Sequence, residues 1–131
     1  MKYPRTFATP DGESHFEEVE VAADVVRVVQ GRPVLESGAP IATGTATMMR
    51  IGADWDGSWH PTPRRWFLIT LSGEMEITTS DGETRCFGPG ALWLLDDTTG
   101  KGHNTRVIGG VEWLGLGVTL ADQEEHMGRT T

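Results

Sequence analysis

The sequence of 131 residues has one cysteine, Cys86, which excludes an intrachain disulfide. A single thiol gives no support for an oxidising compartment, and we expect Cys86 to be a buried, inert side chain in a strand. Long apolar runs are also missing. No stretch approaches the length of a membrane span, and the N-terminal segment lacks the apolar core of a signal peptide. The expectation is a cytoplasmic protein without a membrane partner.

Basic residues are few, with 11 Lys and Arg against 19 Asp and Glu, which gives a formal net charge of -8. A chain of this sign repels nucleic-acid phosphates, so the composition argues against a nucleic-acid partner.

Turn-forming residues, in contrast, are abundant, with 17 Gly and 7 Pro. They separate short segments rich in β-branched residues, and no helical stripe persists for three turns. The pattern predicts strands over 19–29, 41–51, 65–73, 74–82, 84–87, 91–95, 103–108 and 111–120. The segments 65–73 and 74–82 look like an antiparallel pair that turns at Ser72 and Gly73.

This rhythm indicates one all-β domain over residues 1–131, a sandwich or a barrel, with its core in 43–120. Residues 1–16, interrupted by Pro4, Pro10 and Gly12, are expected to be an extended N-terminal arm. At most one short helix is expected, near the C-terminus after Asp122.

The segment 60–104 resembles the two motifs of the cupin superfamily. His60 stands where the first motif begins its His-x-His pair, and Gly73 stands where that motif ends. In the second motif, residues 87–90 (FGPG) match the turn and His103 matches the histidine. The strings DGESHF, HPTPRRW, LSGEMEI, TSDGETR and DTTGKGH more narrowly resemble small single-domain bacterial cupins, which are RmlC-like jelly rolls.

This resemblance implies a cupin double-stranded β-helix, or jelly-roll barrel, with a small-molecule ligand inside. It also implies a homodimer, in which the N-terminal arm is a candidate for exchange between subunits.

The sequence departs from the metal-binding cupin pattern at two positions. Thr62 replaces the second histidine of the pair, and Trp66 stands in the place of the glutamate. Only His60 and His103 remain, whereas transition metals normally take three or four protein ligands. We therefore expect no cofactor. The alternative is a divalent transition metal held by His60 and His103 with help from other groups.

The same residues define a candidate pocket. Strand alternation places Trp66 and Leu68 on one face, and the resemblance implies that this face points into the barrel. Arg64 and Arg65 directly precede Trp66, and one of them, Arg64 in the candidate set, is expected to hold a ligand carboxylate near the barrel mouth. The alternative is a salt bridge within this acidic chain. Thr62 and Trp59 complete the predicted binding set. Two further tryptophans, Trp93 and Trp113, are expected to fill the core or an interface.

His60 and His103 are the candidate catalytic residues, since imidazole both accepts and donates protons near neutral pH. The loop 96–102 is expected to position His103, with Asp97 bonding to backbone amides of the turn. Three hypotheses follow. The leading one is a metal-independent isomerase, cyclase or lyase that acts on an apolar or aromatic small molecule. The others are a metal-dependent dioxygenase or isomerase with a reduced ligand set, and a non-catalytic ligand-binding module.

Overall fold

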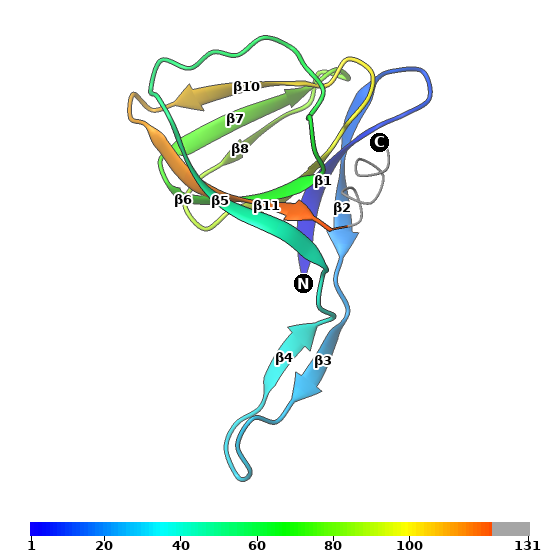
Figure 1. Ribbon diagram of the computed structural model, residues 1–131, viewed down its shortest axis with the longest axis vertical. Coiled ribbons are helices and arrows are strands. Elements are labelled where there is room, and N and C mark those ends of the chain that lie inside the picture. Colours follow the sequence, from blue (N-terminus) through cyan, green and yellow to red (C-terminus); the bar gives the residue numbers. More distant parts are fainter. Residues whose placement is uncertain (122–131) are drawn as a thin grey trace.

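The structure, a computed structural model, describes residues 1–121. Within this range the chain forms strands and no helix, which confirms the predicted all-β class. The short helix predicted after Asp122 lies outside the described residues. No helix of sufficient length and apolarity to cross a membrane occurs in residues 1–121. Figure 1 shows a barrel from which a two-stranded hairpin extends.

A six-stranded sheet forms the larger wall of the barrel, in the order β2-β1-β9-β6-β11-β5. Its strands are β1 (Lys2–Ala8), β2 (Ser14–Glu20), β5 (Thr43–Ile51), β6 (Trp66–Ser72), β9 (Leu92–Asp96) and β11 (Trp113–Leu120). All neighbouring pairs are antiparallel except β1 and β9. Most neighbours are distant in the chain, as in jelly rolls and other Greek-key arrangements.

The opposite wall is a three-stranded sheet in the order β10-β7-β8. Its strands are β7 (Glu74–Thr79), β8 (Thr84–Phe87) and β10 (His103–Ile108). In β7 and along most of β11, every second side chain is buried, so each strand turns one face inward. The inward faces of both sheets contribute to one apolar cluster, which closes the predicted jelly-roll barrel.

Two tryptophans occupy the centre of this cluster. Trp93 and Trp113 are both fully buried, which confirms their predicted place in the core. The ring of Trp93 stacks on Phe87 with centroids 4.1 Å apart. Nε1 of Trp113 donates a hydrogen bond to Oγ1 of Thr70 over 2.9 Å, so this buried indole is satisfied.

A glycine in β11 makes room for a third tryptophan. A Cβ atom at position 117 would lie 2.8 Å from Cζ3 of Trp66, closer than such atoms can approach. Gly117 therefore lets the indole of Trp66 lie against the backbone of β11 inside the barrel.

The prediction of an extended arm over residues 1–16 is wrong. Most of this segment forms β1 and the start of β2, and β1 pairs in parallel with β9 through Arg5, Thr6 and Phe7. Pro4, which cannot donate a backbone hydrogen bond, lies just before these paired residues. The strand is stabilised by a partner about 90 residues away, which the local sequence does not reveal.

Two predicted strand arrangements also need correction. The segment 19–29 is interrupted, because β2 ends at Glu20 and a separate hairpin follows, made of β3 (Ala23–Val26) and β4 (Leu35–Gly38). The strands β6 and β7 do not pair with each other but belong to different sheets. Gly73, at a φ of +79°, joins them at a corner of the barrel. A hairpin turn and a corner between sheets use the same residue types, so sequence did not separate them.

Cys86 lies in β8 with its side chain exposed, contrary to the buried thiol that we expected. Partial desolvation raises the pKa of this thiol, and the negative charges of Glu74 and Glu76 raise it further. A raised pKa disfavours the thiolate, so partial desolvation and the neighbouring negative charges both favour the predicted low reactivity, although the side chain is exposed.

Candidate functional site

A cavity of about 120 Å³ opens inside the barrel, between the two sheets. Its lining comes from β5, β6, β7, β9 and β10 and from the segment that joins β5 to β6. The lining residues are Met49, Ile51, Trp55, His60, Thr62, Pro63, Trp66, Leu68, Met75, Leu95, His103 and Thr105. Most are apolar, and the polar groups among their side chains are two imidazoles, two hydroxyl groups and two indole N–H groups.

His103, the first residue of β10, is held by a buried carboxylate. Its Nδ1 lies 2.7 Å from Oδ2 of Asp97, and the exposed fractions of the two side chains are 2% and 0%. The other carboxylate oxygen accepts a 2.7 Å hydrogen bond from Oγ1 of Thr6 in β1. A carboxylate only accepts hydrogen bonds, so Nδ1 carries the proton and Nε2 remains available to a molecule in the cavity.

Asp97 thus forms hydrogen bonds with three parts of the chain: β1, the start of β10 and the segment before β6. Besides the two side-chain contacts, its backbone carbonyl accepts a 3.0 Å hydrogen bond from the amide of Thr62. From the sequence, Asp97 was predicted only to bond to backbone amides of its turn. A signal for its contact with His103 is the chain order, in which Asp97 directly follows β9 and a histidine begins β10 across a Gly-containing loop.

The neighbouring carboxylate, Asp96, has a different role. It accepts hydrogen bonds from Nε of Arg5 at 2.8 Å and from Nε of Arg65 at 2.6 Å. Burial alone would lower the pKa of Arg5, but its contacts with Asp96 and Glu17 raise it overall. Asp96 therefore balances arginine charge, whereas Asp97 holds the histidine of the cavity.

His60 lies beside His103 but is exposed at the edge of the cavity. The two ring centroids are 5.2 Å apart. Each residue donates its amide to the carbonyl of the other, at 3.2 and 3.0 Å. Nδ1 of His60 lies 3.0 Å from the carbonyl oxygen of Pro61, which accepts hydrogen bonds only and so leaves Nε2 of His60 free as well.

The approach of the two histidines depends on Gly102. This residue has a φ of +72°, and a Cβ atom there would lie 2.0 Å from the carbonyl carbon and oxygen of His60. Both facts require glycine at this position. The Gly-rich loop before β10 therefore lets the backbone of His60 pair with that of His103.

Three predicted binding residues line the cavity, and two do not. Trp66, Thr62 and Leu68 are in the lining, although the hydroxyl of Thr62 already donates to the carbonyl of Arg64 at 2.9 Å. The side chain of Arg64 is exposed and is not part of the lining. Trp59, with an exposed fraction of 48%, borders a separate surface hollow with Ser80 and Lys101.

Arg64 and Trp59 therefore lie outside the cavity lining, and the binding roles predicted for them stay predictions. Both side chains belong to the irregular segment before β6, where strand alternation gives no information about direction.

Several lining residues were not predicted. Thr105 follows His103 by two positions in β10, so strand alternation was a sufficient signal for its inward direction. Met49 and Ile51 occupy the end of β5, and Met75 lies in β7. Their place in the lining depends on how the two sheets face each other, which no local pattern reveals.

The donor set does not fit the metal that a cupin resemblance implies. Within residues 1–121 there is no group of three or more His, Cys, Asp or Glu side chains that could hold a metal ion. The cavity offers two imidazoles, whereas three or four strong ligands are normal for zinc, iron or manganese. The carboxylate nearest to His103 is occupied by hydrogen bonds from His103 and Thr6.

The two sheets and the enclosed cavity define a jelly-roll barrel, the architecture expected of a cupin fold. Among solved structures, this chain is similar to the cupin domain of Cnp3 from Schizosaccharomyces pombe, with a TM-score of 0.48 and 11% identity over 97% of this chain and 88% of that chain. It is also similar to protein NMB1881 from Neisseria meningitidis, with a TM-score of 0.47 and 14% identity over 63% of this chain and 83% of that chain. These likenesses concern the fold and add nothing to the argument on function.

No protein-family model matches the sequence, and no curated protein matches it either.

Proposed function

We propose that the barrel binds a small, mainly apolar molecule and that His103 and His60 transfer protons on it, as in an isomerase, cyclase or lyase. The observation that carries this proposal is the buried contact between Asp97 and His103, which presents Nε2 of His103 to an apolar cavity. This contact fixes the proton on Nδ1 of His103 and leaves Nε2 as the proton acceptor.

The size of the cavity limits the ligand. A cavity of roughly 150 Å³ with apolar walls is known to take up benzene, and the volume here is about 120 Å³. A molecule with one small ring, or a short branched chain, is therefore the class that fits without rearrangement. Nε1 of Trp66 is buried and has no hydrogen-bond partner within residues 1–121, so a ligand whose acceptor oxygen reaches this atom would satisfy the donor.

The two histidines have different tasks in this proposal. His103 acts as the base, because the Asp97 carboxylate stabilises the imidazolium that forms when Nε2 takes a proton. His60, in its protonated form, returns a proton to another atom of the ligand, so an isomerisation leaves the overall composition unchanged. At the end of a cycle His103 carries one proton more and His60 one proton fewer than at the start. The ring centroids lie 5.2 Å apart, so the proton of His103 returns to His60, directly or through water at the exposed edge of the cavity.

The test uses cyclopentanone and cyclohexanone as probes, since each combines one apolar ring, one acceptor oxygen and exchangeable α-protons. Binding is followed by saturation-transfer NMR, and proton transfer by deuterium exchange at the α-carbons in D₂O. The variant His103→Gln should retain binding and lose the acceleration of exchange. Trp66→Ala should weaken binding, and Trp59→Phe, outside the cavity, is the matched control.

Failure of both ketones to bind, or binding unaffected by Trp66→Ala, contradicts the proposed ligand site. Binding without accelerated exchange supports the non-catalytic ligand-binding module instead. Acceleration that chelators abolish and added metal restores would favour the metal-dependent alternative, against the donor set in the cavity.

A further inference from the structure

The hairpin of β3 and β4 is the part of the fold with the least support from its surroundings. Its two strands pair with each other and with no other strand of residues 1–121. Figure 1 shows the hairpin extending away from the barrel. A two-stranded hairpin on its own is marginally stable in water. This hairpin therefore needs a surface to pack against.

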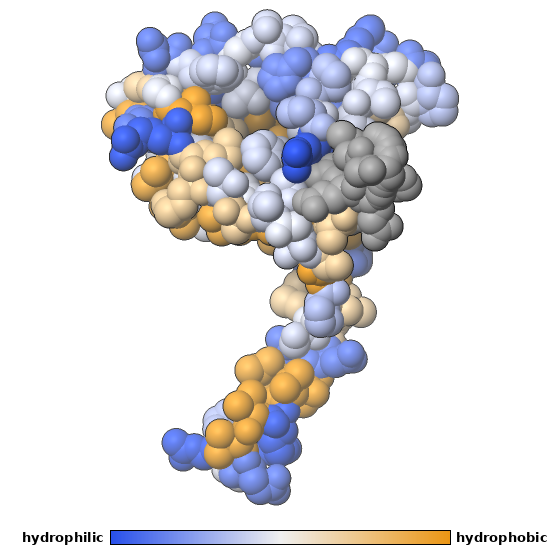
Figure 2. Space-filling view, in the orientation of Figure 1, coloured by the Kyte–Doolittle hydropathy of each residue, from blue (hydrophilic) through white to orange (hydrophobic). Residues whose placement is uncertain are grey.

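The side chains of the hairpin are apolar where a solvated hairpin would be polar. Val25 and Val28 have exposed fractions of 67% and 69%, and Leu35 has 48%. Val29 and Val34 are exposed as well. Figure 2 shows hydrophobic surface along much of the hairpin. Such contiguous exposed apolar patches usually mark interaction sites.

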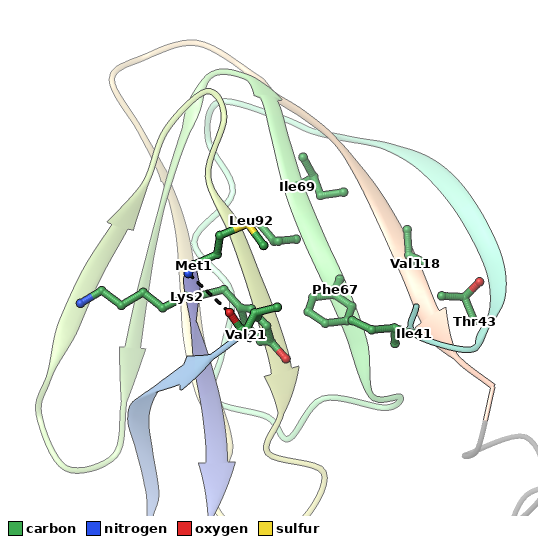
Figure 3. Close-up of a pocket in the computed structure, with 10 residues that line it drawn as sticks. Met1, Lys2, Val21, Ile41, Thr43, Phe67, Ile69, Leu92 and Val118 are labelled. Atoms are coloured by element: carbon green, nitrogen blue, oxygen red, sulfur yellow. Dashed lines mark hydrogen bonds between the residues drawn. The ribbon is translucent and has the colours of Figure 1, made fainter. Parts of the chain in front are cut away.

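A second apolar surface, which no side chain of the described residues covers, lies on the outer face of the six-stranded sheet. This groove has a volume of about 390 Å³, more than three times that of the barrel cavity. Its floor includes Phe67, Ile69 and Val118 from β6 and β11, and Leu92 lines it from the start of β9. Figure 3 shows these side chains gathered on one face of the sheet.

The base of the hairpin forms the rim of this groove. Val21 and Ile41, which lead into and out of the hairpin, both line it. The amide of Val21 donates to the carbonyl of Met1 at 2.7 Å, and the amide of Ala121 donates to the carbonyl of Ala42 at 3.1 Å. Since both legs are fixed to the sheet, the hairpin is directed away from its own groove.

We propose that a second copy of this chain covers the groove by laying its β3–β4 hairpin into it. A twofold axis beside the hairpin base would place each hairpin over the partner's groove. Each chain would then bury its hairpin against the partner and have its own groove covered by the partner's hairpin. Such an interface is closed and self-complementary, as in most homodimers. The exchanged element is thus the hairpin rather than the N-terminal segment.

The charge distribution supports this choice of occupant. The chain as a whole carries a formal charge of -8, which opposes self-association. The segment 23–38, however, contains Asp24, Arg27, Arg32 and Glu36 and no other charged residue, so its net charge is zero. A neutral apolar hairpin can approach an acidic copy without the repulsion that the rest of the chain would meet.

The test measures the oligomeric state of the full chain by sedimentation velocity over a range of protein concentrations. We expect a dimer that Val25→Asp in the hairpin and Leu92→Asp in the groove each weaken by roughly tenfold or more. Leu71→Asp is the matched control, because Leu71 is exposed on the same sheet but does not line the groove. All substituted side chains are at least partly exposed, so the variants should fold.

A cross-linking experiment identifies the contact itself. In a Cys86→Ser background, a chain with Val25→Cys is mixed with a chain that carries Leu92→Cys, and a short bismaleimide is added. The mixed pair should yield a cross-linked dimer, and a pair of Val25→Cys with Leu71→Cys should not.

Three results would overturn the proposal. The first is a monomer at every concentration. A dimer unaffected by both Val25→Asp and Leu92→Asp is the second. The third is a monomer that binds phosphatidylglycerol vesicles through the hairpin, which would assign the apolar patch to a membrane.

Discussion

Substitution of Asp97 by alanine should destabilise the fold by an amount that the buried contacts define. The carboxylate accepts hydrogen bonds from Oγ1 of Thr6 and Nδ1 of His103, each 2.7 Å long, and all three side chains are buried. Each buried donor left without an acceptor costs about 1–3 kcal/mol. Two such donors predict a loss of about 2–6 kcal/mol in the free energy of unfolding, out of a typical total of about 5–15 kcal/mol.

Urea unfolding followed by tryptophan fluorescence measures this loss, since Trp93 and Trp113 are fully buried and report on the core. The comparison variant Thr6→Val leaves one oxygen of Asp97 without its donor and the amide of Asp96 without its acceptor. It keeps the contact between Asp97 and His103, so it should cost about 1–3 kcal/mol, less than Asp97→Ala. The pair Asp97→Ala and His103→Ala should be non-additive, because the two side chains are in contact.

A loss of less than about 1 kcal/mol for Asp97→Ala would refute the reasoning. So would full additivity with His103→Ala. Either result would mean that Asp97 does not fix the orientation of His103, and the proposed base would lose its support.

Three further predictions concern single positions. Gly102→Ala should lower the free energy of unfolding in urea more than Gly82→Ala. Both residues have a positive φ, but of the two only Gly102 has backbone atoms within 4 Å of the added Cβ. Equal losses would contradict the close packing at Gly102. Hydrogen bonds from Lys101, and next from Ser80, lower the pKa of Glu13 below its ordinary value of 4.5. The ionised Glu13 therefore stabilises the fold at a pH above 4.5, and this stabilisation is lost as the pH falls below 4.5 and through the lowered pKa. Melting temperatures measured across this range should therefore drop less in Glu13→Gln than in the unmodified chain, and identical drops would contradict the sign. Cys86, with its raised pKa, should react more slowly with a disulfide reagent at neutral pH than a free cysteine does, despite its exposure.

Local pattern alone was sufficient for many elements of the fold. The segments 84–87 and 103–108 were predicted with the bounds that β8 and β10 have in the structure. The alternation that assigned Trp66 and Leu68 to one face also holds, since both line the cavity. These results follow from the two-residue period of a strand, which is a property of the backbone and needs no knowledge of neighbours.

Tertiary structure decided which strand lies beside which. The period of a strand tells which residues share a face but not which strand lies beside it, so β1 appeared to be an arm and β6 and β7 appeared to be a hairpin. Asp97 became part of the site only because the loop after β9 returns it to the start of β10 and to Thr6. The sequence by itself determined an all-β chain with two histidines in register with a cupin motif. Folding determined which side chains surround them, because hydrogen bonds and packing join residues that are about 90 positions apart in the chain.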